Sequence, residues 1–172
     1  MHDASQPTLW TPNRSAGKKG AFFYAELAQE LEALLADEAD AIANAANAAA
    51  AIFHALPELN WTGFYFARGE ELVLGPFQGL PACIRIPFGA GVCGRAAALR
   101  QSVLVPDVEA FPGHITCDTA SRSELVVPVL GTDGSLLGVL DLDSPRLGRF
   151  DEQDRAGCEV LAAIVGRALS RG

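Results

Sequence analysis

The segment from Ser123 to Pro145 constrains the fold of this chain more than any other. Two apolar runs, SELVVPVLG and LLGVLDLDSP, are separated by four polar or small residues, Thr132 to Ser135. The Asp-Gly pair in this connection tolerates the positive φ that a tight turn between antiparallel strands requires. The sequence therefore predicts a β-hairpin and, with it, an antiparallel sheet.

The second strand of this hairpin is expected to carry two acids on one face. Side chains alternate between the two faces of a strand, so Asp141 and Asp143 point the same way. The same parity predicts Leu137 and Val139 on the face of the two acids, and Leu136, Leu140 and Leu142 on the other.

The remaining apolar patterns predict four helices and four further strands along the chain. Helical spacing covers residues 21–35, about 40–56, a short stretch from about 91, and the chain from about 151 onward. Strand patterns cover 60–67, 71–77, 83–87 and 102–108. This order predicts one α+β domain, an antiparallel sheet flanked by helices, over residues 21–172. Residues 1–20 show no sustained period and are expected to form an N-terminal arm.

Composition limits the partners and the compartment. The net charge is −8 and the pI is near 4.8, which argues against nucleic acid as a partner. No apolar run has the length of a membrane span, and a cytoplasmic protein is expected. Because thiols are kept reduced there, the four cysteines are not expected to form a permanent disulfide framework and are more typical of redox or ligand roles.

Cys117 lies in a loop rich in turn-forming residues, EAFPGHITCDTASRS, seven residues before Glu124. Its polar neighbours, with His114 and Arg122 nearby, favour a partly exposed thiol shifted toward thiolate. The alternative is an inert free cysteine. Cys158, in contrast, falls on the apolar stripe of the last predicted helix and is expected in the core.

An aromatic run, NWTGFYFA, places Trp61, Gly63 and Tyr65 on one strand face. Large aromatic side chains most often belong to the core. Gly63 between the two rings is expected to leave space on that face, where a small apolar ligand could lie.

Five motifs together resemble one family. NWTGFYF, LGPFQG, PACIRIPFGAGVCG, GHITCDTASRSELVVP and GVLDLDSP are similar to segments of the free methionine-(R)-sulfoxide reductases, which are single GAF-domain proteins. The resemblance implies a GAF domain that reduces the R epimer of free methionine sulfoxide. It assigns Cys117 as the catalytic cysteine, Cys83 as the main resolving cysteine and Cys93 as an accessory one. It also implies a thioredoxin-type reductant, no cofactor and no metal, and it leaves a homodimer open.

The same resemblance assigns Glu124, Asp141 and Asp143 to a polar pocket that suits an ammonium group. Crowded carboxylates do not all ionise cheaply, so one of them is expected to hold a proton for the sulfoxide oxygen. Which acid does so is left open. Trp61 and Tyr65 are expected to enclose the methyl end of the substrate. The alternative is that Asp143 only begins a turn and Glu124 is solvated.

Two other functions compete with this assignment. The first is a GAF module that senses a small molecule without catalysis, which would not need three cysteines around one pocket. The second is a zinc site built from Cys83, Cys93, Cys117 and His114. Spacings of ten and twenty-four residues between these cysteines, without a C-x₂-C pair, fit zinc poorly. His114 is not included in the predicted site, because a lone loop histidine is more often simply exposed.

Overall fold

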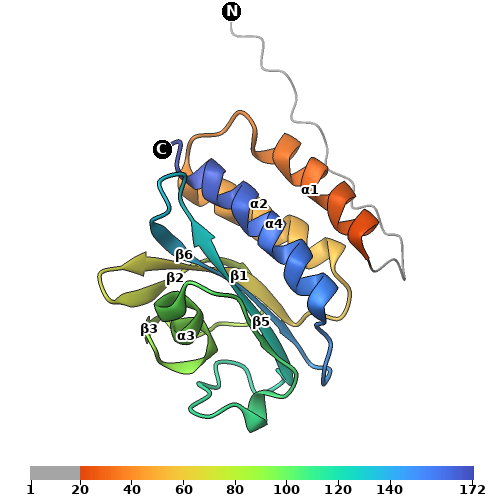
Figure 1. Cartoon of the computed structure of the whole chain (residues 1–172), viewed down its shortest axis with the longest axis vertical. Coiled ribbons are helices and arrows are strands. Elements are labelled where there is room, and N and C mark those ends of the chain that lie inside the picture. The colour runs from red at the N-terminus through yellow and green to blue at the C-terminus, as the bar shows by residue number, and fades with distance from the viewer. Residues whose placement is uncertain (1–19) are drawn as a thin grey trace, which may run out of the picture.

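The computed structural model describes residues 20–172, and the arm predicted over residues 1–20 lies outside this range except for Gly20. Six strands form one antiparallel sheet in the order β3-β2-β1-β6-β5-β4, with helices on both faces (Figure 1). The predicted α+β class is therefore confirmed.

The strands are β1 (Trp61–Arg68), β2 (Glu71–Gln78), β3 (Arg85–Pro87), β4 (Val103–Val105), β5 (Ser123–Leu130) and β6 (Leu136–Ser144). The helices are α1 (Ala21–Leu35), α2 (Ala41–Ala55), α3 (Gly91–Leu99) and α4 (Glu152–Leu169), with a short 3₁₀ helix at Val108–Ala110. The third strand is shorter than the predicted 83–87, so Cys83 precedes it in a loop. The fourth is likewise shorter than the predicted 102–108.

The sheet separates two apolar cores. Helices α2 and α4 cover one face, and α1 packs against both of them (Figure 1). The opposite face is covered by α3, which contacts β5 and β6 as well as β2 and the two short strands. The core beneath α1, α2 and α4 is called the helix-covered core, and the core beneath α3 is called the α3 core. On β5 the side chains of Leu125, Val127 and Val129 enter the helix-covered core, while Val126 enters the α3 core. This alternation places Glu124 on the α3 side.

The hairpin of β5 and β6 is confirmed, but one detail of its parity is wrong. The pairing moves from Val129 with Gly138 to Leu130 with Leu136, which leaves Leu137 as an extra residue on β6. Such a bulge reverses which face the flanking residues occupy. Leu137 therefore packs against the helix-covered core and Leu136 against the α3 core, the opposite of the predicted faces.

Helix α4 begins where the sequence predicts. The Asp151 side chain accepts hydrogen bonds from the backbone N–H groups of Gln153 and Asp154, and the Asp154 side chain accepts one from the Asp151 N–H. This reciprocal cap satisfies N–H groups that have no partner within the helix. Cys158 is fully buried on the inner stripe of α4, as expected.

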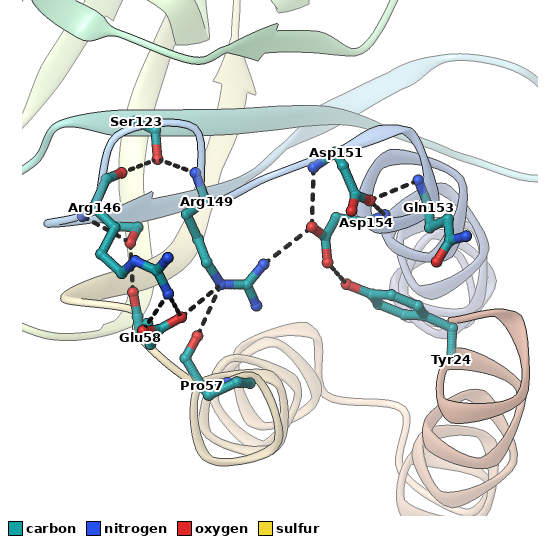
Figure 2. A network of polar contacts seen from close by, with 10 residues as sticks. Tyr24, Pro57, Glu58, Ser123, Arg146, Arg149, Asp151, Gln153 and Asp154 are labelled. Carbon is teal, nitrogen blue, oxygen red and sulfur yellow. Dashed lines mark hydrogen bonds and ion pairs between the residues drawn. The ribbon is translucent and has the colours of Figure 1, made fainter. Parts of the chain in front are cut away.

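A buried polar network joins α1, α4 and the loop that follows β6 (Figure 2). Arg149 Nη1 donates to Asp154 Oδ2 at 3.0 Å, and Arg149 Nε donates to the carbonyl of Pro57 at 3.1 Å. The Tyr24 hydroxyl donates to the other oxygen of Asp154 at 2.7 Å. Both Arg149 and Asp154 are buried, so each compensates the other's charge where water cannot.

The same network holds the start of β5 and the end of β6. The Ser123 hydroxyl donates to the carbonyl of Arg146 at 2.6 Å and accepts from the N–H of Arg149 (Figure 2). The Ser144 hydroxyl donates to the carbonyl of Glu58 at 2.6 Å. Ser123 and Ser144 pair with each other on the neighbouring strands β5 and β6, and they immediately flank Glu124 and Asp143. The network therefore fixes the backbone from which two of the predicted site acids project.

Candidate active site

Three carboxylates gather on the α3 face of the sheet because of strand register. Glu124 on β5 pairs with Asp143 on β6, and Val126 pairs with Asp141. Asp141 and Asp143 lie two residues apart on one strand and so project to the same side. Glu124, Asp141 and Asp143 all line one small cavity with Tyr65 of β1 and Cys93 of α3.

Cys117 closes this cavity from the loop between the 3₁₀ helix and β5. Its side chain is half-buried, and a disulfide joins it to Cys83, with the two Cα atoms 5.4 Å apart. The two cysteines are 34 residues apart in the chain. The structure thus brings together the pair that the family resemblance assigned to attack and resolution, while the roles themselves stay predictions.

Cys93 occupies a different position. It lies in the first turn of α3, is buried, and is one of two free cysteines among residues 20–172. Its Sγ lies 3.9 Å from Oε1 of Glu124. Burial, followed by the nearby Asp141 and Glu124 charges, raises the pKa of the Cys93 thiol well above its ordinary value. Without a bound cation Cys93 is therefore a neutral thiol, which is a poor nucleophile.

The pKa values of the three carboxyl groups are raised, mainly because the groups are buried. Burial raises the pKa of Glu124 to about 7, with the Asp143 charge adding to the rise and His114 opposing it. The pKa values of Asp141 and Asp143 are also raised well above the usual range, first by burial and then by the charge of a neighbouring acid. Glu124 therefore carries a proton in a substantial fraction of molecules near neutral pH.

The alternative assignments for the acids are wrong. Glu124 is only 6% exposed, so it is not solvated. Asp143 lies within β6 and pairs with Trp61 and Glu124 rather than beginning a turn. The turn is supported by Ser144, whose hydroxyl accepts from the N–H of Arg146 at 3.1 Å.

His114 belongs to this site, although the sequence analysis excluded it. Its Nε2 lies 3.4 Å from Oε2 of Glu124, and its side chain is largely buried. An aperiodic loop gives no sequence signal for the direction in which a side chain points, so only the folded loop shows this contact.

The cysteine loop is tied to the sheet by residues that the sequence analysis also missed. Asn60, just before β1, donates from Nδ2 to Asp118 at 2.9 Å and to the Ser121 hydroxyl at 3.0 Å. Ile115 packs against Gly91 at the start of α3, where a Cβ would lie 3.2 Å from Ile115 and φ is +60°. These contacts hold the loop over the acids. Asn60 is the first residue of the NWTGFYF motif, but nothing in its spacing indicates a contact with the loop.

The predicted space beside Gly63 does not exist. A Cβ at Gly63 would lie 2.7 Å from the Trp61 ring and also against Phe77. Trp61 is 2% exposed, stacks on Phe77 and Tyr65, and donates from Nε1 to the carbonyl of Leu80 at 3.1 Å. The absent side chain therefore makes room for packed rings, and Tyr65 rather than Trp61 reaches the cavity. The predicted contact of Trp61 with substrate stays a prediction.

The cavity is small in this disulfide-bonded state. It encloses about 30 Å³, which is close to the share of one water molecule in the liquid. A larger surface groove of about 610 Å³ runs beside α4 and β5, but it contains none of the cysteines or acids described above. Chemistry rather than size therefore identifies the cavity under Cys117 as the candidate site.

No helix within residues 20–172 combines the length and the apolar character that crossing a bilayer would require.

Comparison with known proteins agrees with the geometry. The GAF domain family matches residues 30–169. Protein YtsP of Bacillus subtilis is 55% identical over 86% of this chain and 91% of that protein. The free methionine-R-sulfoxide reductase of Escherichia coli is 45% identical over 86% of this chain and 89% of that enzyme. A solved structure of free methionine-R-sulfoxide reductase from Neisseria meningitidis with its substrate is 46% identical, covers 90% and 93% of the two chains and superimposes with a TM-score of 0.83.

Proposed function

Because this chain belongs to the GAF-domain family, and within it to the free methionine-R-sulfoxide reductases, we propose that it reduces the R epimer of free methionine sulfoxide to methionine. The observation that carries the proposal is the Cys83–Cys117 disulfide lying over three buried carboxylates. A redox pair accounts for the electrons of the reaction, and the acids account for a proton and for the choice of a free amino acid.

Cys117 is the proposed nucleophile. With the disulfide reduced, its thiolate attacks the electrophilic sulfur of the sulfoxide, and the sulfoxide oxygen takes up a proton. The oxygen then transfers from the substrate sulfur to Cys117 Sγ: the substrate sulfur–oxygen bond and the transient bond between the two sulfurs break, a bond from Sγ to oxygen forms, and methionine leaves. Cys117 is thereby oxidised to a sulfenic acid as the sulfoxide is reduced. The Cys83 thiol then condenses with the sulfenic acid, which forms the disulfide and releases one water molecule.

The acids divide into two roles in this proposal. Glu124 is the proton donor for the sulfoxide oxygen, because its pKa of about 7 keeps the proton available near neutral pH. Asp141 and Asp143 hold the substrate ammonium, whose positive charge favours their ionised form. Tyr65 supports the apolar end of the substrate from β1. His114 orients Glu124 through the contact of 3.4 Å.

Recycling requires an external dithiol. We propose a thioredoxin-type donor, which reduces the disulfide by thiol–disulfide exchange and itself becomes oxidised. The Cys83–Cys117 pair is suited to this exchange, because neither cysteine is fully buried. A compartment that keeps such donors reduced is needed, and the cytoplasm is the proposed location.

An assay of three substrates tests the proposal. Reductant-dependent methionine release is expected from the free R sulfoxide, with little from the free S epimer and with little reduction of N-acetylated R sulfoxide. The acetylated compound lacks an ammonium and leaves Asp141 and Asp143 without their partner. An unpaired buried polar group costs about 1–3 kcal/mol, so kcat/KM should fall roughly tenfold to a hundredfold.

N-acetylated R sulfoxide and free R sulfoxide share the reacting sulfur, so their comparison isolates the ammonium. Equal rates for the two would remove the selective role of the carboxylates. Absence of methionine release from the free R epimer, with a reductant shown to open the disulfide, would refute the function itself.

Replacing Cys83 by Ser separates resolution from attack. The variant is expected to release one equivalent of methionine from pre-reduced protein, because Cys117 is intact, and then to stop because the sulfenic acid has no partner thiol. Rapid quenching with methionine quantification measures the burst, and a sulfenic-acid reagent detects the stalled product. A variant that releases no methionine in the first turnover would show that Cys83 acts before resolution.

A further inference from the structure

Cys93, Glu124 and Asp141 form a cluster with the composition of a metal site. Each offers one potential ligand atom, and the three atoms lie within 4.8 Å of one another. They come from three elements, α3, β5 and β6, and all three residues are buried. The reaction steps proposed above use Cys117 and Cys83, whereas Cys93, to which the family resemblance gives an accessory role, lies between two acids and takes no part in those steps.

A second, independent observation is that one buried carboxylate oxygen of the cluster lacks a hydrogen-bond partner. Oδ1 of Asp141 accepts no hydrogen bond, and bulk water does not replace one, because the atom is buried and the residue is only 6% exposed. A buried carboxylate oxygen without a partner costs free energy, so a ligand that satisfies it binds favourably. Asp141 lines the same cavity as Cys93 and Glu124, and one of its carboxylate oxygens lies within 4.8 Å of the ligand atoms of both residues.

The separation between the Cys93 and Glu124 ligand atoms suits a tetrahedral cation. Zinc binds sulfur at about 2.3 Å and carboxylate oxygen at about 2.0–2.2 Å, so its ligand atoms lie roughly 3–4 Å apart. The Cys93 Sγ to Glu124 Oε1 distance is 3.9 Å, within that range. The cavity volume of about 30 Å³ leaves room for one water as the fourth ligand.

We propose that Cys93, Glu124 and Asp141 bind a divalent cation of the zinc class, and that this cation inhibits the enzyme. A thiolate ligand favours zinc, cobalt and cadmium over magnesium and calcium, which prefer oxygen alone. The inhibition rests on the proposed function, because the metal then occupies the acids that would hold the substrate ammonium and donate the proton. This site differs from the zinc site rejected above, since it uses neither Cys83 nor Cys117.

The disulfide makes the binding test specific. In protein with Cys83 and Cys117 oxidised, Cys93 and Cys158 are the remaining free thiols within residues 20–172. Titration with Co²⁺ should give a thiolate-to-cobalt charge-transfer absorption that saturates at one equivalent and is removed by Zn²⁺. Cys93→Ser should abolish this absorption, and Asp141→Asn should weaken cobalt binding at least tenfold. The matched control, Cys158→Ala, should bind as the parent does.

Inhibition is tested on the reduced enzyme. Zn²⁺ at ten times its dissociation constant should raise the apparent KM for the free R sulfoxide about elevenfold with little change in kcat. This is the result expected when metal and substrate compete for one site. EDTA should reverse the effect. Cys93→Ser should lose this sensitivity, measured as the ratio of its own KM values with and without zinc.

Each failure has a distinct meaning. No charge-transfer absorption, or one that persists in Cys93→Ser, overturns the site whether or not the enzyme is active. Metal binding without a rise in KM overturns the inhibition. Metal binding by a protein that reduces no sulfoxide at all, even in EDTA, supports the site and refutes the proposed function instead.

Discussion

Replacement of Cys117 by Ser is expected to abolish turnover of free methionine sulfoxide to the background rate. A serine hydroxyl does not ionise near neutral pH and forms no sulfenic acid, so both the nucleophile and the oxygen acceptor are lost. Reductant consumption and methionine release both measure this loss. Folding should be retained, because Cys117 is only half-buried in a loop that Asn60 anchors through Asp118 and Ser121.

Cys158→Ala is the matched control for Cys117. Cys158 is buried in the core on α4, and its thiol has no route to the cavity between α3 and the sheet. Its loss should alter kcat/KM by less than about twofold, since no contact with substrate or with the acids is removed. Similar losses from the two replacements would mean that the loop cysteine does not carry the chemistry.

Replacement of Arg149 by Met is expected to destabilise the folded protein by about 3–5 kcal/mol. The change leaves the Asp154 carboxylate buried without its cation, and it also removes the donor to the Pro57 carbonyl (Figure 2). For a chain of this size, a loss of this kind lowers Tm by roughly 6–20 °C. Thermal and urea unfolding of the disulfide-bonded protein measure it.

Arg146→Met provides the comparison at the surface. Arg146 forms an ion pair with Glu58, but both side chains are substantially exposed, and exposed pairs contribute little. Its removal should therefore leave Tm almost unchanged. If Arg149→Met were as stable as Arg146→Met, the buried network would not be what holds the ends of β5 and β6.

The hairpin and the helices could be predicted from the sequence because their signals are local. Each of three features depends on residues within a few positions of one another: the turn from Thr132 to Ser135, the helix cap at Asp151 and the apolar stripe containing Cys158. The same is true of the loop character around Cys117. Short-range backbone preferences and side-chain periodicity determine such features, so a reading of neighbouring residues was sufficient.

The composition of the candidate site could be predicted only partly. Local alternation placed Asp141 and Asp143 on one strand face, and the motif resemblance supplied the cysteines and Glu124. The bulge at Leu137 and the filled space beside Gly63 contradicted the sequence predictions. Both depend on which residue lies opposite in the neighbouring strand, and a single strand carries no record of that.

The sequence by itself determined the α+β class, the hairpin and the residues capable of redox and acid chemistry. Only the tertiary structure decided that Glu124 faces Asp143, that His114 reaches Glu124, and that Cys83 lies against Cys117 across 34 residues. Burial of the acids, and with it their raised pKa values, also arises only when α3 and the cysteine loop cover the sheet. The physical reason is that desolvation and long-range contacts are properties of packed elements, whereas turns and helix stripes are properties of adjacent residues.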